Sequence, residues 1–244
     1  MSLSRAQQDL LSQLKASLEK GLTTDEASAR READGSFNVV TPPINCPSWV
    51  CCLLPCIKHV PSMKAFAQIK PEDAEVKRNG KWIRYDAASL VTGDVIRLEE
   101  GDIVPADCVV LLLGDGETHS KKKKKKKSTA APVVELLVDH RLVTGEDKPR
   151  SSAPVTSDPS SSEPVTQAQP IQLYWGGRVV QGSAVAVVNA VGAKTFVASL
   201  IKEGRFPPTD SMLLLVPNDD RDGDEEVGIS LISNSGKGMT GGVV

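Results

Sequence analysis

Two kinds of hydrophobic spacing divide this chain. Residues 3–20 place leucines at helical intervals with charged residues between them, which predicts an amphipathic helix. From residue 76 to residue 113, short apolar runs rich in β-branched residues alternate with glycine, proline and asparagine. That pattern is typical of short strands joined by turns. The spacing therefore predicts a mostly β domain with helices in front of it.

A second N-terminal helix is expected directly after Gly21. Thr24 is a candidate N-cap, and Asp25 and Glu26 fall in the first turn, where carboxylates complement the helix dipole. Gly35 is placed to end this helix.

The β-rich part begins with a hairpin signal, because Asn79-Gly80 separates two short alternating runs. Further apolar runs follow up to residue 113, at 133–138 and at 184–191, and residues 193–203 predict a closing helix. Short strands with turn residues at close intervals indicate a small distorted β-barrel or sandwich.

Composition shifts along the chain suggest four regions. We expect a helical segment over residues 1–40, a connector containing cysteines and prolines over 41–70, a β domain over 71–206 and a polar, flexible tail over 207–244. Within the β domain, residues 115–131 and 151–169 are a lysine-rich and a Ser/Pro-rich insertion, whose composition is typical of disordered segments.

Overall composition excludes several classes of protein. A net charge of −2 calls for no nucleic-acid partner, and no apolar run approaches the length of a membrane-spanning helix. The N-terminus lacks the basic and apolar regions of a secretory signal. Five cysteines, an odd number with four clustered, fit reduced thiols better than a disulfide framework. We therefore expect a cytoplasmic protein, with peripheral attachment to the cytoplasmic face of a membrane left open.

Three blocks of the sequence resemble the actuator domain of P-type cation-transporting ATPases, closest to the plasma-membrane proton-pump class. They read "VKRNGKWIRYDAASLVTGDVIRLEEGDIVPAD", "VDHRLVTGEDKP" and "GGRVVQGSAVAVVNAVGAKT". An upstream stretch, "GLTTDEASARREADGSFNVV", is similar to the helical segment in front of the first membrane helix of those pumps. The resemblance spans residues 21–203 and implies a small distorted β-barrel of the double-stranded β-helix or jelly-roll type, with N-terminal helices.

The resemblance assigns structural roles to several turns. Gly93-Asp94, Gly101-Asp102 and Asp107 fall in motifs where glycine permits unusual backbone shapes and aspartate accepts hydrogen bonds from turn amides.

Thr144, Gly145 and Glu146 match the catalytic signature of these pumps. The resemblance implies that Glu146 orients and deprotonates the water that hydrolyses an aspartyl phosphate on another domain, with Thr144 and Gly145 supporting it. The family usually has serine after the glutamate, whereas this chain has Asp147. A second negative charge facing an anionic phosphate disfavours efficient dephosphorylation.

Other parts of a pump are not recognisable in this sequence. It contains no Asp-Lys-Thr-Gly-Thr motif, no nucleotide-binding segment and no Gly-rich phosphate loop, and the connector takes the place of the first membrane hairpin. We therefore expect no enzymatic activity of the chain alone and no cofactor. The favoured interpretation is a stand-alone regulatory or scaffolding module that binds another protein, with a P-type ATPase as the candidate partner and the oligomeric state open. The alternatives are a truncated or degenerate pump fragment and a hydrolase half that uses Glu146 in trans.

The cysteine cluster is a candidate for lipid attachment or interaction through Cys51, Cys52 and Cys56. Apolar residues and lysines surround these thiols, as at reversibly acylated cysteines. Their spacing does not match a zinc site, so no metal is predicted. Burial as small apolar residues in a packed connector is an equal alternative.

A basic patch is formed by Lys121, Lys122, Lys123, Lys124, Lys125, Lys126 and Lys127. Seven like charges most simply form a solvated stretch. Contact with an anionic membrane leaflet and nuclear targeting are the alternatives. His119 and His140 are predicted to be surface groups, and Trp82 and Trp175 to pack in the core or at the edge of the barrel.

Overall fold

Two antiparallel sheets and a set of short helices form the described part of the chain. The computed structural model describes residues 3–35, 37–45, 60–114, 136–151 and 171–208. The helices are α1 (Arg5–Gln13), α2 (Thr24–Asp34), α4 (Pro61–Ile69), α5 (Arg141–Thr144) and α6 (Phe196–Lys202), with 3₁₀ turns at Ala87–Ser89 and Gly192–Lys194. The strands are β1 (Asp73–Arg78), β2 (Lys81–Asp86), β3 (Val95–Leu98), β4 (Asp107–Leu113), β5 (Leu137–Asp139), β6 (Arg150–Ser151), β7 (Gln172–Leu173), β8 (Arg178–Gln181) and β9 (Ala184–Ala190).

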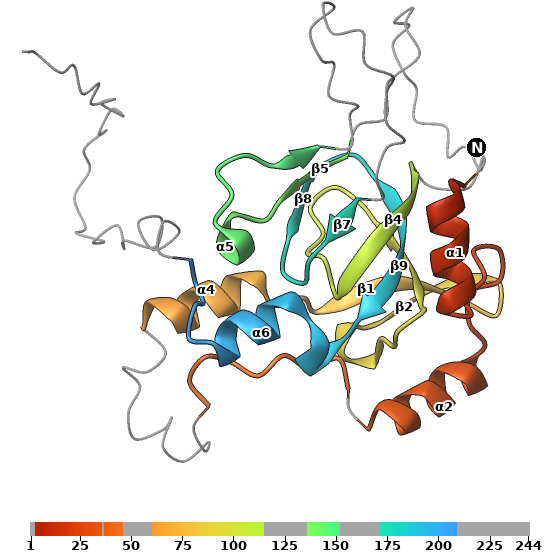
Figure 1. The fold of residues 1–244 in the computed structure, drawn as a ribbon, viewed down its shortest axis with the longest axis horizontal. Coiled ribbons are helices and arrows are strands. Elements are labelled where there is room, and N and C mark those ends of the chain that lie inside the picture. Colours follow the sequence, from red (N-terminus) through yellow and green to blue (C-terminus); the bar gives the residue numbers. More distant parts are fainter. Residues whose placement is uncertain (1–2, 36, 46–59, 115–135, 152–170, 209–244) are drawn as a thin grey trace, which may run out of the picture.

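The larger sheet has the order β2-β1-β3-β9-β4-β7, and the smaller has the order β6-β5-β8 (Figure 1). The predicted hairpin at Asn79-Gly80 joins β1 to β2, and both turn residues have positive φ. The predicted mostly β fold with flanking helices is therefore confirmed. In the described residues both sheets stay open, with β2 and β7 at the edges of the larger one, so the distorted barrel or sandwich is not closed there.

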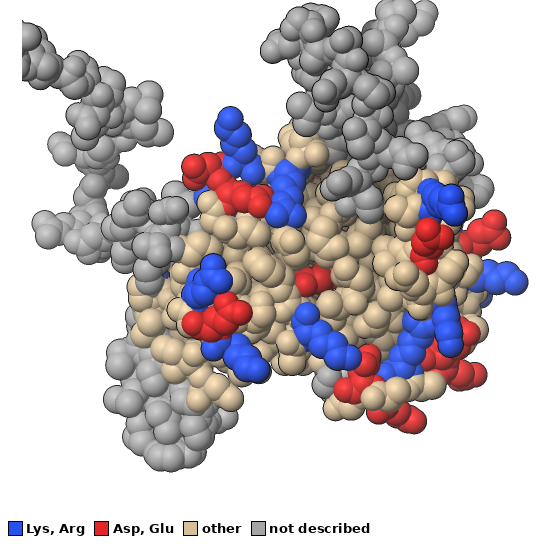
Figure 2. All heavy atoms as spheres, in the orientation of Figure 1, with Lys and Arg blue, Asp and Glu red and all other residues tan. Residues whose placement is uncertain are grey.

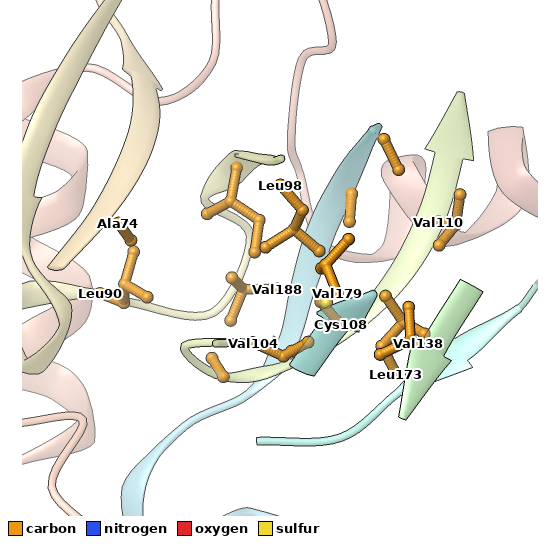
Figure 3. Close-up of a cluster of buried hydrophobic side chains, with 14 of the residues drawn as sticks. Ala74, Leu90, Leu98, Val104, Cys108, Val110, Val138, Leu173, Val179 and Val188 are labelled. Atoms are coloured by element: carbon orange, nitrogen blue, oxygen red, sulfur yellow. The ribbon is translucent and has the colours of Figure 1, made fainter. Parts of the chain in front are cut away.

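Strands β4 and β9 are apolar apart from Asp107 and Asn189, because both of their faces are covered. Cys108 and Val110 point into the main core, while Val109 and Leu111 form a second cluster with Leu11 of α1. Side chains alternate between the two faces of a strand, so a continuous apolar run is required where helices cover one face and a sheet folds over the other. Figure 3 shows Cys108 and Val110 beside Val138, Leu173 and Val179 in the main core.

Both predicted N-terminal helices are present. The last residue of α1 and the capping residue of α2 differ from those predicted. Helix α1 has a capping box between Ser4 and Gln7 and ends at Gln13, well before residue 20. Helix α2 is capped by Thr23 instead of Thr24, because Thr23 has Glu26 at the third helical position and the two cap one another. Gly35 ends α2 in the left-handed conformation, which confirms its predicted role.

Helix α4 lies at the end of the segment assigned to the cysteine- and proline-containing connector, residues 41–70, where no helix was predicted. Pro61 occupies its first turn, and Phe66 and Ile69 are buried. Proline is compatible with a helix start, where its missing N–H would have no helical partner. The apolar periodicity of this short helix is masked by the proline- and cysteine-containing sequence before it.

A helical cluster packs at one end of the sheets, where α4, α5 and α6 come together (Figure 1). Trp175 lies at its centre, 3% exposed, and stacks on Phe66 with ring centroids 5.5 Å apart. The predicted packing role of Trp175 is confirmed. The predicted closing helix is present as α6, which starts later than expected because a 3₁₀ turn precedes it.

The turn aspartates also accept the predicted backbone hydrogen bonds. Asp94 accepts from Val91 N at 2.9 Å, and Asp102 accepts from Glu99 N at 2.8 Å. Asp107 reaches further along the chain, because its two oxygens accept from Trp175 N at 2.8 Å and Phe196 N at 2.6 Å. Asp107 thereby ties the start of β4 to the helical cluster.

Candidate functional site

The Thr144-Gly145-Glu146 turn ends a single helical turn that follows β5. Thr144 donates to the His140 carbonyl through its amide at 2.7 Å and its hydroxyl at 3.2 Å. Gly145 ends α5 in the left-handed conformation, with φ +76°, and a Cβ there would lie 3.0 Å from Pro208. Glycine is required at this point by both its backbone shape and the close approach of Pro208.

Glu146 is paired with Arg150. Oε1 accepts from Nη2 at 2.7 Å and Oε2 accepts from Nε at 2.9 Å, so both carboxylate oxygens are engaged in a two-bond fork. The side chains are 38% and 29% exposed, respectively. The hydrogen bonds from Arg150 lower the pKa of the Glu146 carboxyl below its ordinary value. The carboxylate therefore lies at the surface, ionised and partly neutralised.

Arg150 is itself held from two other sides. Its Nη1 donates to the Gln172 carbonyl at 3.0 Å, and its guanidinium lies over the Tyr174 ring at 4.9 Å. Tyr174 in turn packs on Phe196 of α6, with ring centroids 4.6 Å apart. Neither Arg150 nor Tyr174 was among the predicted site residues. The four-residue spacing from Glu146 was the available signal for Arg150, but the intervening residues are not helical, so the helical pairing rule did not apply.

His140 lies beneath the turn and is 1% exposed, so its predicted surface position was wrong. Its Nε2 accepts a hydrogen bond from Tyr174 N at 3.1 Å. Burial, followed by the charge of Arg150, lowers the pKa of His140 to about 4. Gly177 makes room for the ring, since a Cβ there would lie 2.6 Å from Nε2. The histidine is therefore a neutral support of the site, and its burial depends on residues more than 30 positions away that no local pattern reveals.

The neutral state of His140 makes stability depend on pH. A pKa lower in the folded than in the unfolded chain means that the unfolded chain takes up the proton first as the pH falls from 6.5 towards 4. We expect His140→Gln, which keeps an acceptor for Tyr174 N, to remove this loss. The stability difference between the two proteins should shift by about 3 kcal/mol, at about 1.4 kcal/mol per pKa unit.

Urea unfolding at a series of pH values measures this difference. Burial raises the pKa of Asp107 to about 6, which gives the opposite slope in the same range and partly hides the histidine effect in the wild type. The comparison with the variant isolates it. A stability difference that stays constant from pH 7 to pH 4 would contradict a buried neutral His140.

Several predicted sites lie outside the described residues. These are Cys51, Cys52 and Cys56, the seven lysines at 121–127, His119, and nearly all of the two insertions and the tail. Within the described residues, Cys108 is a free and buried thiol, and no group of three or more His, Cys, Asp or Glu side chains is placed to hold a metal. None of the described helices is long and apolar enough to cross a bilayer.

Comparison with known proteins identifies the protein family that part of this chain resembles. Residues 68–128 match the P-type ATPase actuator domain. The "Endoplasmic reticulum calcium ATPase srcA" of Aspergillus fumigatus is 31% identical over 139 residues, which are 57% of this chain and 12% of the relative. A solved zinc-transporting PIB-type ATPase in its E2.Pi state is 21% identical with a TM-score of 0.38, over 57% of this chain and 17% of that one.

The chain thus spans about an eighth of the length of the calcium ATPase that it matches, 12%. The matched range begins in α4, runs through β1 to β4 and ends before Thr144, so it characterises the domain and not the turn. The family match assigns residues 68–128 to the actuator domain of P-type ATPases, and the sheet-rich fold agrees with this assignment.

Proposed function

We propose that this chain is a docking module that presents the Thr144–Glu146 turn to the phosphorylated domain of a P-type ATPase, in a regulatory or scaffolding role. The observation that carries the proposal is the Glu146–Arg150 pair. It stands at the surface at the end of α5, on a turn braced by β5, β6 and Tyr174. A braced, charged turn suits recognition of a charged partner surface. Its site of action would be the cytoplasmic face of the membrane that holds the pump.

Hydrolysis in trans is the second candidate, since the match of Glu146 to the catalytic signature favours it. The present geometry favours it less. A general base should have a pKa near the working pH and a free oxygen to accept the proton of water. Here both oxygens accept from Arg150, which lowers the pKa of Glu146.

Asp147 offers a test of docking. Its side chain is exposed beside Glu146, where its negative charge opposes that of a phosphorylated partner. We expect Asp147→Lys to tighten binding to a phosphorylated calcium pump by about fivefold to tenfold at low salt, and less as salt screens the charge. Sedimentation of the full chain with pump-containing vesicles measures the affinity. Asp73→Lys is the matched control, because Asp73 is also exposed but lies on β1.

The same assay separates the two candidates. For a docking module, the lifetime of the pump phosphoenzyme should be the same with wild-type chain and with Glu146→Gln. A lifetime shortened by the wild type and restored by Glu146→Gln would establish hydrolysis in trans instead. Absence of binding to every state of the pump, or equal effects of the Asp147 and Asp73 substitutions, would reject docking.

A further inference from the structure

We infer that Arg150 is a phosphoryl-binding residue and that Glu146 occupies its guanidinium fork in the absence of the ligand. The inference rests on the proposed function and deepens it, because it names the residue that would recognise the phosphoryl group of the partner. The exposed carboxylate then acts as an internal competitor for the fork.

The first support is the shape of the contact. The Nε and Nη2 groups of Arg150 meet the two oxygens of Glu146 at 2.9 and 2.7 Å. A planar guanidinium presents this pair of donors equally well to two oxygens of a carboxylate or of a phosphoryl group. Glu146 therefore shows where the oxygens of an incoming phosphoryl group would sit.

The second support is that Arg150 has contacts besides Glu146 that hold it in place. The Gln172 carbonyl holds Nη1 at 3.0 Å, and the face of Tyr174 supports the guanidinium. An exposed pair on the hairpin provides a contrast: Arg84 lies 3.5 Å from Asp73, and its side chain is 63% exposed. A guanidinium with fixed neighbours loses less conformational freedom on binding a ligand than a free one does.

The third support is the difference between the backbones of the two partners. Arg150 begins β6 and pairs with Val138 of β5, whereas Glu146 lies between Gly145 and β6 outside regular structure. Rotation of the glutamate side chain away from the fork disturbs no strand pairing. Glu146 can therefore yield its place while Arg150 remains fixed.

Local charge also fits an anion. Residues 141–150 contain three cationic side chains and two acidic ones, and one of the acidic ones is Glu146 itself. In Figure 2, blue and red side chains lie side by side at the upper left, over the region of α5 and β5 in Figure 1. When an anion replaces Glu146 in the fork, the remaining charge of the turn is positive.

The test is a titration of the full chain with inorganic phosphate, followed by the backbone N–H NMR signals of Thr144, Gly145 and Asp147, which every variant retains. We expect Glu146→Gln to bind phosphate about tenfold more tightly than the wild type, because a neutral amide competes weakly for a guanidinium. Combining it with Arg150→Lys should remove the gain, since lysine lacks the fork. The matched controls Asp73→Asn and Arg84→Lys should leave phosphate affinity unchanged.

Equal phosphate affinity of wild type and Glu146→Gln would overturn the inference, as would a gain that survives Arg150→Lys. Acetyl phosphate and a phosphorylated pump serve as second and third probes, to separate a free phosphate from a phosphoryl group carried on a carboxylate. If the chain does not bind the pump while Glu146→Gln still tightens phosphate binding, the docking proposal fails and the phosphoryl site stands. If the chain docks and Arg150→Lys changes nothing, docking stands and the role of Arg150 is rejected.

Discussion

Asp94→Ala is expected to lower the free energy of unfolding by about 3–5 kcal/mol, the range measured when one partner of a buried ion pair is removed. Asp94 is 0% exposed, and its oxygens accept from Arg78 Nε at 3.0 Å and Nη2 at 2.6 Å. It also accepts from Val91 N. Without the carboxylate, the Arg78 side chain, 4% exposed, retains its charge in the core with only the Ser89 carbonyl and the Tyr85 ring as described partners.

Urea unfolding of the single and double variants tests the origin of this loss. Arg78→Met combined with Asp94→Ala should recover part of the stability, because the buried charge is gone while Val91 N still lacks its acceptor. Asp73→Ala removes an exposed partner of Arg84 and should cost about 1 kcal/mol or less. A double variant no more stable than Asp94→Ala would show that the charge left on Arg78 is not the cause.

Gly21→Ala is expected to destabilise the fold by about 4 kcal/mol or more, a loss reserved for severe steric or backbone conflict. Gly21 has φ +66°, and a Cβ there would lie 1.8 Å from the carbonyl oxygen of Lys77. The contact cannot relax easily, because Lys20 and Leu22 on either side accept hydrogen bonds from the β1–β2 turn, from Gly80 N and Asn79 N. The alanine would have to separate the start of α2 from the hairpin.

Gly35 provides a matched control. It has nearly the same backbone angle, φ +64°, but a Cβ there would meet no atom within 4 Å. Gly35→Ala should therefore cost only the left-handed conformation, about 1–2 kcal/mol. Thermal and urea unfolding of the two variants separate steric overlap from backbone preference. Equal losses would show that the close approach to Lys77 contributes nothing.

Local sequence signals were sufficient where the residues that determine a turn or a helix end lie within that same element. Asn79-Gly80 predicted the hairpin because its turn needs positive φ at both central positions. Gly35 predicted the end of α2 for the same kind of reason. The resemblance supplied the domain type, which the family match confirms over residues 68–128. That the two sheets stay open in the described residues was not predictable from strand patterns, because closure depends on how edge strands meet and not on alternation within a strand.

Errors arose where distant residues decide the outcome. His140 looks like an isolated surface histidine in the sequence, yet Tyr174 and Gly177 bury it and keep it neutral. Helix α4 looks like part of a connector, yet Trp175 supplies the surface on which Phe66 packs. Neither partner can be identified from the neighbouring sequence.

By itself the sequence determined the antiparallel hairpin, the glycine turns, the two N-terminal helices and the position of Glu146 behind a Thr-Gly pair. These features follow from backbone preferences and hydrophobic periods that act over a few residues. Only the tertiary structure decided that Arg150, held by Gln172 and Tyr174, takes up both oxygens of Glu146. The ionisation of the Glu146 carboxyl, and its availability to a ligand, depend on charges, hydrogen-bond donors and burial that separate strands contribute. The distances between those groups cannot be read from the sequence.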